Sequence, residues 1–465
     1  MRNRGSSDKI HLATRKFRNI NFKRKIYDRI LRWKASRNGK TALLVEGARR
    51  VGKSFTVAEF ARREYKSHVI VDFSSPQPLT LDAILNAPHD LDGLFNRLSL
   101  EYHTRLYPRE TLIVFDEVQL CPKARQLIKH LVADGRYDYI ETGSLITLKT
   151  MSEGILIPSE EERISMHPMD FEEFCWALDD GVTPGFIREC FDKSKPLGAL
   201  HRTVMNRYCE YLCVGGMPQV VAEYAATKDI SSADLVKRDI LKLYRDDIAK
   251  FAKGNAAKVR SIFDQIPGQL AKKEKRYSLA SLDKSARMRE YEDSFIWLAD
   301  AKVVNPCYNA TDPTVGMALS SDFSTMKLYM GDTGLLMTLA LGDESATSGD
   351  LYKAIFTGDV YFNSGMIAEN AVAQSFAMSG RPLFFYSRRN PESHRNELEI
   401  DFLIRRDGVI SPVEVKSGKY QSHASLDKFR AKFKDRLGQP YILYTKDVME
   451  KDGILHLPLY MAMFL

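Results

Sequence analysis

A short segment of small and basic residues has the composition of a phosphate-binding loop. Residues 47–54 read Gly-Ala-Arg-Arg-Val-Gly-Lys-Ser and fit the pattern GxxxxGK[ST] in full. Glycines at 47 and 52 let the backbone wrap closely around phosphates, while the loop amides and the start of a following helix favour negative charge. Lys53 would reach the β and γ phosphates, and the Ser54 hydroxyl would bind Mg²⁺. The segment therefore predicts ATP and Mg²⁺ as cofactors.

We expect nucleotide contacts from the whole loop and the residue after it. These residues are Gly47, Ala48, Arg49, Arg50, Val51, Gly52, Lys53, Ser54 and Phe55. The two arginines inside the loop are expected to be solvent-facing or structural rather than catalytic. The alternative is a chance glycine turn, which the strand-like residues before the loop and the helix-like residues after it disfavour.

An apolar run that ends in two acids is the second half of the predicted site. Residues 112–117 read Leu-Ile-Val-Phe-Asp-Glu, as expected for a buried strand that delivers its terminal acid to the phosphate-bound metal. Asp116 would hold Mg²⁺, directly or through water. Glu117 would then serve as the general base that polarises the attacking water, because Asp116 is occupied by the metal. The pair predicts hydrolysis.

A third strand-like run ends in hydroxyl residues. Tyr139-Ile140-Glu141 is followed by Thr142-Gly143-Ser144, so a hydroxyl could reach the γ-phosphate or the water from a neighbouring strand. Thr142 or Ser144 is a candidate sensor, and a plain turn built from glycine and serine is the alternative. The predicted catalytic residues are thus Glu117, Lys53 and Thr142.

These residues need a parallel sheet to bring them together. Strand-like runs at 41–47, 68–73, 111–117 and 137–143 are separated by segments long enough for crossover helices, which predicts an α/β fold with a mainly parallel sheet. From about residue 165 to about 300 the pattern is helical. Residues 277–307 read as two helices and a strand, the order of a winged helix-turn-helix.

The last hundred residues contain a second possible site. Residues 397–404 and 411–418 are strand-like, and 405–408 form a hairpin turn between them. Strict alternation would place Ile400, Phe402 and Ile404 on one side, and Asp401 with Glu414 and Lys416 on the other. Two carboxylates and a lysine could hold Mg²⁺ or Mn²⁺ and act on a phosphodiester. The alternative is an ordinary amphipathic hairpin with solvated charges.

Composition sets the broad class. The chain has 465 residues, 44% hydrophobic and 28% charged, which predicts a folded protein of two to four domains. No stretch approaches the roughly 20 apolar residues of a bilayer span, so we expect no membrane partner and a cytoplasmic location. Six scattered cysteines indicate reduced thiols and no zinc site. Basic residues crowd positions 15–34, which fits either a polyanion partner or a solvated helix face.

The ordered blocks resemble prokaryotic AAA+-like ATPases that carry a C-terminal nuclease-like region of unassigned function. The blocks are GARRVGKS, LIVFDEVQ, TGS at 142–144, HPMDFEEF at 167–174, YLCVGGMP at 211–218, KLYMGDTGLL at 327–336, and then GMIAEN, EIDFLI and VEVKSG. The resemblance implies a PD-(D/E)xK-type domain in which Glu369 adds a third carboxylate. With that addition the predicted metal ligands are Ser54, Asp116, Glu369, Asp401 and Glu414. Family members often have Gly-Arg where this chain has Glu162 before Arg163, so no arginine is assigned to phosphate sensing.

The resemblance also implies an order of domains. We expect a basic N-terminal helical segment (1–37), a P-loop ATPase core (38–175), a helical lid (176–255), a winged-helix-like region (256–345) and a nuclease-like α/β domain (346–465). It further implies a homo-oligomer, because sites of this kind are completed by a neighbour's arginine.

Together these features predict an ATP-binding, Mg²⁺-dependent ATPase that acts as a molecular switch or motor, with DNA or another nucleic acid as a candidate partner. The alternative is an ATP-gated binding or scaffold protein whose nuclease-like domain is catalytically inactive. A small-molecule kinase also uses a phosphate loop, but the Asp-Glu pair and the large helical and C-terminal regions favour hydrolysis.

Overall fold

The structure is a computed structural model that describes most of the chain in two compact units. The described residues are 22–86, 90–144, 159–252, 254–272, 276–279, 287–314, 316–342, 349–357, 363–389, 396–418 and 423–465. Of these residues, the N-terminal unit comprises those within 23–167 and 300–302, and the C-terminal unit comprises those within 168–299 and 303–465. No helix among the described residues is both long and apolar enough to cross a membrane.

The N-terminal unit is built on a five-stranded sheet with the order β2-β3-β4-β1-β5. Its strands are β1 (Ala42–Glu46), β2 (Ser67–Asp72), β3 (Thr111–Asp116), β4 (Asp138–Gly143) and β5 (Glu161–Ser165). Every neighbouring pair is parallel. Strands β1, β3 and β4 are buried along their whole length, which explains their continuous apolar character. The predicted parallel α/β fold is confirmed.

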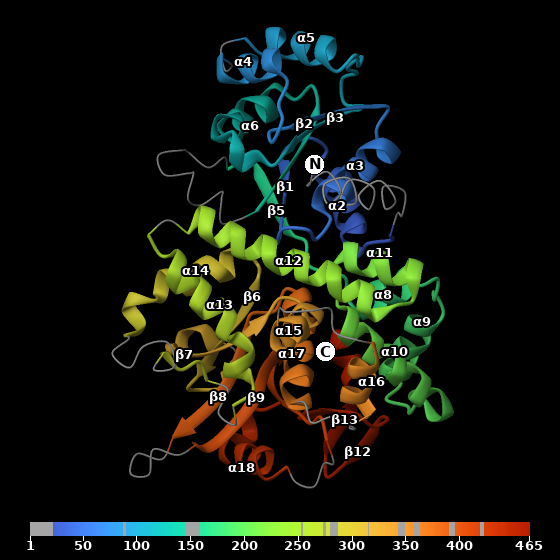
Figure 1. Cartoon of the computed structure of the whole chain (residues 1–465), viewed down its shortest axis with the longest axis vertical. Helices are drawn as coiled ribbons and strands as arrows, with labels where there is room; N and C mark the ends of the chain where they lie inside the picture. Colours follow the sequence, from blue (N-terminus) through green and yellow to red (C-terminus); the bar gives the residue numbers. More distant parts are fainter. Residues whose placement is uncertain are drawn as a thin grey trace, which may run out of the picture. The chain divides into compact units, whose positions relative to one another are not determined.

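Helices cover both faces of this sheet (Figure 1). They are α2 (Lys25–Arg37), α3 (Lys53–Glu64), α4 (Pro78–Asn86), α5 (Leu91–Glu101), the 3-10 turn η1 (Val118–Leu120) and α6 (Pro122–Asp134). Helix α2 buries Ile26, Ile30 and Trp33, and the ring of Tyr27 lies 5.3 Å from that of Phe60 on α3. The apolar face of α2 thus packs within the N-terminal unit, and the boundary at residue 37 stays a prediction.

The C-terminal unit begins with a run of helices, as the pattern predicted. They are α8 (Phe171–Ala177), α9 (Thr183–Asp192), η2 (Gly198–Leu200), α10 (His201–Val214), α11 (Pro218–Thr227), α12 (Ile230–Phe251), α13 (Ala256–Leu270), η4 (Met288–Glu290) and α14 (Glu292–Asp300). Helix α8 starts with a capping box in which Asp170 and Glu173 each bond the other's backbone N–H. This cap explains the acidic character of the block at 167–174.

The rest of this unit is organised around an eight-stranded mixed sheet with the order β12-β13-β11-β10-β9-β8-β6-β7. The strands are β6 (Val304–Ala310), β7 (Ser321–Met330), β8 (Leu383–Arg389), β9 (Asn396–Arg406), β10 (Val409–Val415), β11 (Tyr441–Tyr444), β12 (Met449–Lys451) and β13 (Ile454–Pro458). The remaining helices are η5 (Met317–Ser320), α15 (Thr333–Leu341), α16 (Gly349–Thr357), α17 (Ser364–Met378), α18 (Ala424–Phe433), η6 (Lys434–Arg436) and η7 (Leu459–Phe464).

The sheet contains strands from both sides of the boundary predicted at residue 345. Strand β6 pairs in parallel with β8, so the strands assigned to a winged-helix-like region belong to the same sheet as the C-terminal strands. The winged-helix prediction rested on the order of elements in 277–307, part of which (280–286) lies outside the described residues. The order of elements along the chain does not show with which distant strand an apolar strand will pair.

Strand β9 also departs from even alternation. Tyr386 on β8 pairs with Ile400 and Phe384 pairs with Leu403, so a step of two residues along β8 matches a step of three along β9. Both of these residues lie in the core cluster under α18, whereas the Phe402 ring packs 5.5 Å from that of Phe376 on α17. The prediction that Ile400 and Phe402 share a face is therefore wrong, because the irregularity inserts a residue that alternation does not count.

Candidate active site

The strand order of the N-terminal sheet brings three functional segments together at the carboxyl ends of its strands. Strands β1 and β3 flank β4, and all three run in the same direction. Their carboxyl ends therefore place the loop at 47–54 beside Asp116 and Thr142. Ligands of open parallel sheets bind at this edge, where the strand order reverses.

The phosphate loop has the backbone that its glycines permit. A Cβ on Gly47 would lie 2.2 Å from the carbonyl oxygen of Met166, so only glycine fits there. Gly52 has φ of +96° and precedes Lys53, the first residue of α3. Arg50 is left-handed at φ 70°. The amides at the start of α3 are thus presented towards the edge of the sheet, as an anion site requires.

Some side chains of the phosphate loop are buried and others are exposed. Ala48 and Val51 are buried in the core, whereas Arg49 and Arg50 are exposed, as expected of residues without a catalytic role. Phe55 is 41% exposed on the first turn of α3. The nucleotide contacts predicted for these side chains remain predictions.

Lys53 is buried against its own loop. Its ammonium donates hydrogen bonds of 3.0 Å to the carbonyl oxygens of both Gly47 and Ala48. Burial lowers the pKa of Lys53, while the carboxylates of Glu117 and Asp116 act in the opposite direction. The side chain that would hold phosphates is thus satisfied by carbonyls when no phosphate is present.

Two hydroxyls converge on one carboxylate oxygen. The Ser54 hydroxyl donates to Oδ1 of Asp116 at 2.8 Å, and the fully buried Thr142 hydroxyl donates to the same oxygen. Hydroxyl and carboxylate oxygens are ligands that Mg²⁺ prefers, so Ser54 and Asp116 fit the predicted metal role. The position of Thr142 favours orienting Asp116 over direct contact with a phosphate. Ser144 lies one residue beyond β4.

Glu117 is held in an unusual backbone conformation. Its φ of 55° and ψ of 43° are left-handed, which costs a residue with a Cβ about 1 kcal/mol. Its backbone N–H donates to the Thr142 hydroxyl at 3.4 Å, and the side-chain amide of Gln119 donates to its carboxylate. Strained residues that the surroundings hold in place are typical of functional sites. The sequence analysis missed Gln119, although its spacing of two residues from Glu117 is visible.

Arg24 is a second residue that the sequence analysis did not single out. Its guanidinium donates to the carbonyl oxygen of Val51 at 3.0 Å and to that of His167 at 2.7 Å. It therefore braces the phosphate loop from the residue that precedes α2. Its only sequence signal was membership of the basic cluster at 15–34.

Comparison with known sequences agrees with this geometry. Residues 39–175 match the profile of a family described as AAA domain. They form an AAA-like domain. Residues 205–346 and 364–460 each match a family described as a domain of unknown function, DUF8612 and DUF4143 respectively. No curated protein matches the chain.

Solved structures give only distant likenesses. The Walker-type ATPase of Pyrococcus abyssi is 13% identical with a TM-score of 0.41, over 69% of this chain and 96% of that one. The Orc1 protein of Aeropyrum pernix in complex with DNA is 13% identical with a TM-score of 0.25, over 70% and 93%. Drosophila ORC bound to DNA is 12% identical with a TM-score of 0.27, over 68% and 95%. At these scores they add nothing to what the AAA-like domain itself shows.

The carboxylates predicted as a second metal site lie in the C-terminal unit, where each is paired with a lysine. Glu369 and Asp401 lie 3.2 and 3.8 Å from the ammonium of Lys327, and Glu414 pairs with Lys416 at 2.7 Å. Among the residues that the structure describes, no three acidic, histidine or cysteine side chains are grouped to hold a metal ion. The sequence analysis missed Lys327, although it lies in the block at 327–336.

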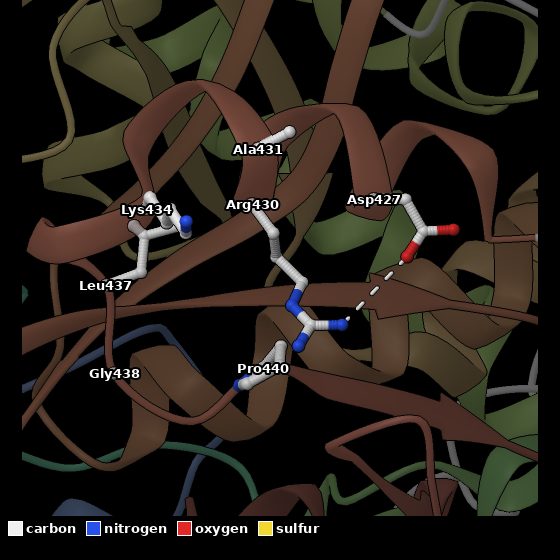
Figure 2. A pocket seen from close by; sticks show the side chains of 7 residues that line it. All are labelled: Asp427, Arg430, Ala431, Lys434, Leu437, Gly438 and Pro440. Atoms are coloured by element: carbon white, nitrogen blue, oxygen red, sulfur yellow. Dashed lines mark ion pairs between the residues drawn. The ribbon is translucent and has the colours of Figure 1, made fainter.

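A pocket on the C-terminal unit is shown in Figure 2. Its lining residues are Asp427, Arg430, Ala431, Lys434, Leu437, Gly438 and Pro440. The Arg430 guanidinium lies 3.9 Å from the Asp427 carboxylate and donates to the carbonyl oxygen of Asp452 at 3.1 Å. Its charge is thus used within the protein, and we assign no ligand to this pocket.

The AAA-like domain also buries a pair of carboxyl groups. Glu141 on β4 is completely buried, and burial together with the charge of Glu161 raises its pKa well above the ordinary value. Arg125 on α6 donates to both oxygens of Glu161, at 2.9 and 3.0 Å. Neither carboxyl oxygen of Glu141 has a hydrogen-bond partner among the described residues. The raised pKa of Glu141 therefore favours its protonated form.

This pair predicts a pH dependence of stability. The unfolded chain releases the Glu141 proton near pH 4.5 while the folded protein retains it, so the stabilisation is complete below that pH and is lost as pH rises through the folded pKa. Glu141→Gln should reduce this loss of stability between low and high pH, because the amide does not titrate. Urea unfolding at pH 5 and pH 8 would measure it. Equal pH dependence in the parent and the variant would contradict the assignment.

Proposed function

We propose that the chain is an ATP-binding protein whose AAA-like domain hydrolyses ATP with Mg²⁺ and works as a switch or motor. The observation that carries the proposal is the convergence of Ser54 and Thr142 on one oxygen of Asp116, with Glu117 held separately beside it. The Asp116 carboxylate is thus oriented to bind a metal ion, and the Glu117 carboxylate can act as a general base. A phosphate loop used only for binding would not need the second.

The residues suggest a sequence of events. Lys53 would exchange its bonds to the Gly47 and Ala48 carbonyls for bonds to the β and γ phosphates. Ser54 and Asp116 would hold Mg²⁺, which when bound neutralises charge on the phosphate oxygens. Glu117 would accept a proton from water as its oxygen attacks the γ-phosphorus and the bond to the β-phosphate oxygen breaks. The products are ADP and phosphate.

Phosphate release without any added acceptor tests this proposal. The full chain should release phosphate from ATP when Mg²⁺ is present and should stop when EDTA is added. A chain that forms ADP only when a small-molecule acceptor is supplied, with the phosphoryl group on the acceptor and no free phosphate, would be a kinase instead. A chain that binds ATP and never turns it over would be the ATP-gated scaffold considered above.

The partner is tested by the same assay. Nucleic acid remains the candidate because basic residues crowd the N-terminal segment and the formal net charge is +8. Turnover should be compared with no addition and with single-stranded DNA, double-stranded DNA and RNA. Stimulation by one of them identifies the partner class, whereas equal rates in all four reject nucleic acid.

We also propose that the protein assembles, at least transiently, when ATP is bound. Arg24 holds backbone carbonyls, Arg163 pairs with Glu161 at 2.7 Å, and the exposed loop arginines Arg49 and Arg50 are not expected to be catalytic. A neighbouring copy would then supply the arginine that balances the transition-state charge. Light scattering with and without ATP should show a larger species with ATP, and a monomer under both conditions rejects the proposal.

A further inference from the structure

The C-terminal unit contains a buried lysine in the middle of its acidic side chains. Lys327 on β7 is 1% exposed, and its ammonium lies 2.8 Å from a Glu399 oxygen. The same nitrogen lies 3.2 Å from Glu369 Oε1 and 3.8 Å from Asp401 Oδ1. Three carboxylates from α17 and β9 thus share one cation that the chain itself supplies.

The carboxylates have further protein donors. Oε1 of Glu369 also accepts a hydrogen bond from the Tyr329 hydroxyl, and Oδ2 of Asp401 accepts one of 2.8 Å from the backbone N–H of Val415. A carboxylate that already accepts such bonds must give some of them up to bind a metal ion at about 2.0–2.1 Å. The oxygens are therefore arranged around an ammonium and N–H or O–H donors.

The surroundings of the Lys327 ammonium favour a cation. Oxygens of Glu369, Glu399 and Asp401 lie 3.2, 2.8 and 3.8 Å from it. The ammonium also lies 4.9 Å from the centre of the Phe385 ring, a second contact that favours a cation. A divalent ion placed between the same oxygens would have to displace this charge or lie beside it, and both are unfavourable.

We infer that the Lys327 ammonium occupies the place that a divalent cation would need between Glu369 and Asp401. The acidic set of Glu369, Glu399 and Asp401 is then a cluster neutralised from within the chain, which fixes β7, α17 and β9 together and does not hold a divalent ion. This conclusion goes beyond the proposed ATPase and does not depend on it.

Manganese binding tests the inference directly. The probe is Mn²⁺ followed by electron paramagnetic resonance on the full chain without nucleotide, in a Lys53→Ala background that disables the phosphate loop. This parent should show no site at Glu369 and Asp401. Lys327→Met should gain one site per chain that binds Mn²⁺ at least about tenfold more tightly than anything in the parent, and adding Glu369→Gln should remove it.

The matched control is Lys432→Met. Its ammonium donates to the Tyr386 hydroxyl at 2.6 Å from α18, so the same loss of charge elsewhere should create no site. Mn²⁺ binding by the parent that Glu369→Gln or Asp401→Asn abolishes would overturn the inference. A folded Lys327→Met that gains no site would do so as well. If Lys327→Met does not fold, the titrations of the parent and of Asp401→Asn still decide.

Discussion

Lys53→Ala should weaken ATP binding by about a hundredfold or more while the protein stays folded. The ammonium would make charge-assisted bonds to two phosphates, each worth about 1.5–3 kcal/mol, and roughly 1.4 kcal/mol corresponds to a tenfold change in affinity. The hydrogen bonds of the same ammonium within the protein run to the carbonyl oxygens of Gly47 and Ala48, in its own loop. Its loss should therefore cost the complex much more than it costs the free protein.

Calorimetric titration with a non-hydrolysable ATP analogue would measure the effect, and thermal unfolding would verify the fold. The matched control is Lys129→Ala, which removes the same charge from an exposed position on α6. Equal affinities in Lys53→Ala and in the control would show that the loop binds nucleotide by some other means, or does not bind it.

Glu117→Gln should leave ATP binding within about threefold of the parent but reduce turnover by about a hundredfold or more, the usual contribution of a positioned base. The amide has nearly the same shape and its oxygen can still accept the hydrogen bond from Gln119. It cannot take a proton from water. Binding and hydrolysis should therefore separate in this variant, whereas Lys53→Ala affects both.

Single-turnover phosphate release, measured beside the calorimetric titration, distinguishes the two effects. Glu110→Gln is the matched control, because the Glu110 carboxylate forms an exposed ion pair with Lys66 at 3.1 Å. Unchanged phosphate release in Glu117→Gln would rule out its role as the base. Gln119 would then be holding Glu117 for a structural reason alone.

The AAA-like domain was largely readable from the sequence, because its signals are local. The loop at 47–54, the acids that end β3 and the hydroxyl that ends β4 each lie next to an apolar strand, and parallel strands bring such ends to one edge. Gln119 and Arg24 were missed for the opposite reason. Neither side chain belongs to a motif, and their roles come from contacts that only the folded chain creates.

The site in the C-terminal unit was predicted less accurately from the sequence. The prediction used patterns of neighbouring residues, whereas the contacts join residues that are far apart in the sequence. Lys327 lies on β7, the last strand in the sheet order, whereas Asp401 lies on β9, three strands away, and Glu369 lies on α17. No spacing rule relates these residues, and the register shift in β9 breaks the alternation of faces. The motif therefore predicted a metal site without revealing that Lys327 lies beside two of its carboxylates.

The pairing of β6 with β8 has a consequence for how this protein is made and divided. The hairpin of β6 and β7 leaves the ribosome before α17 and β8, so one side of β6 has unsatisfied N–H and C=O groups until the later strand arrives. Cutting the chain near residue 345 would separate β6 from β8, so these backbone groups would stay unpaired in both fragments. Each would keep an open strand edge suited to pairing with another molecule, so the fragments should aggregate or recombine rather than behave as independent domains.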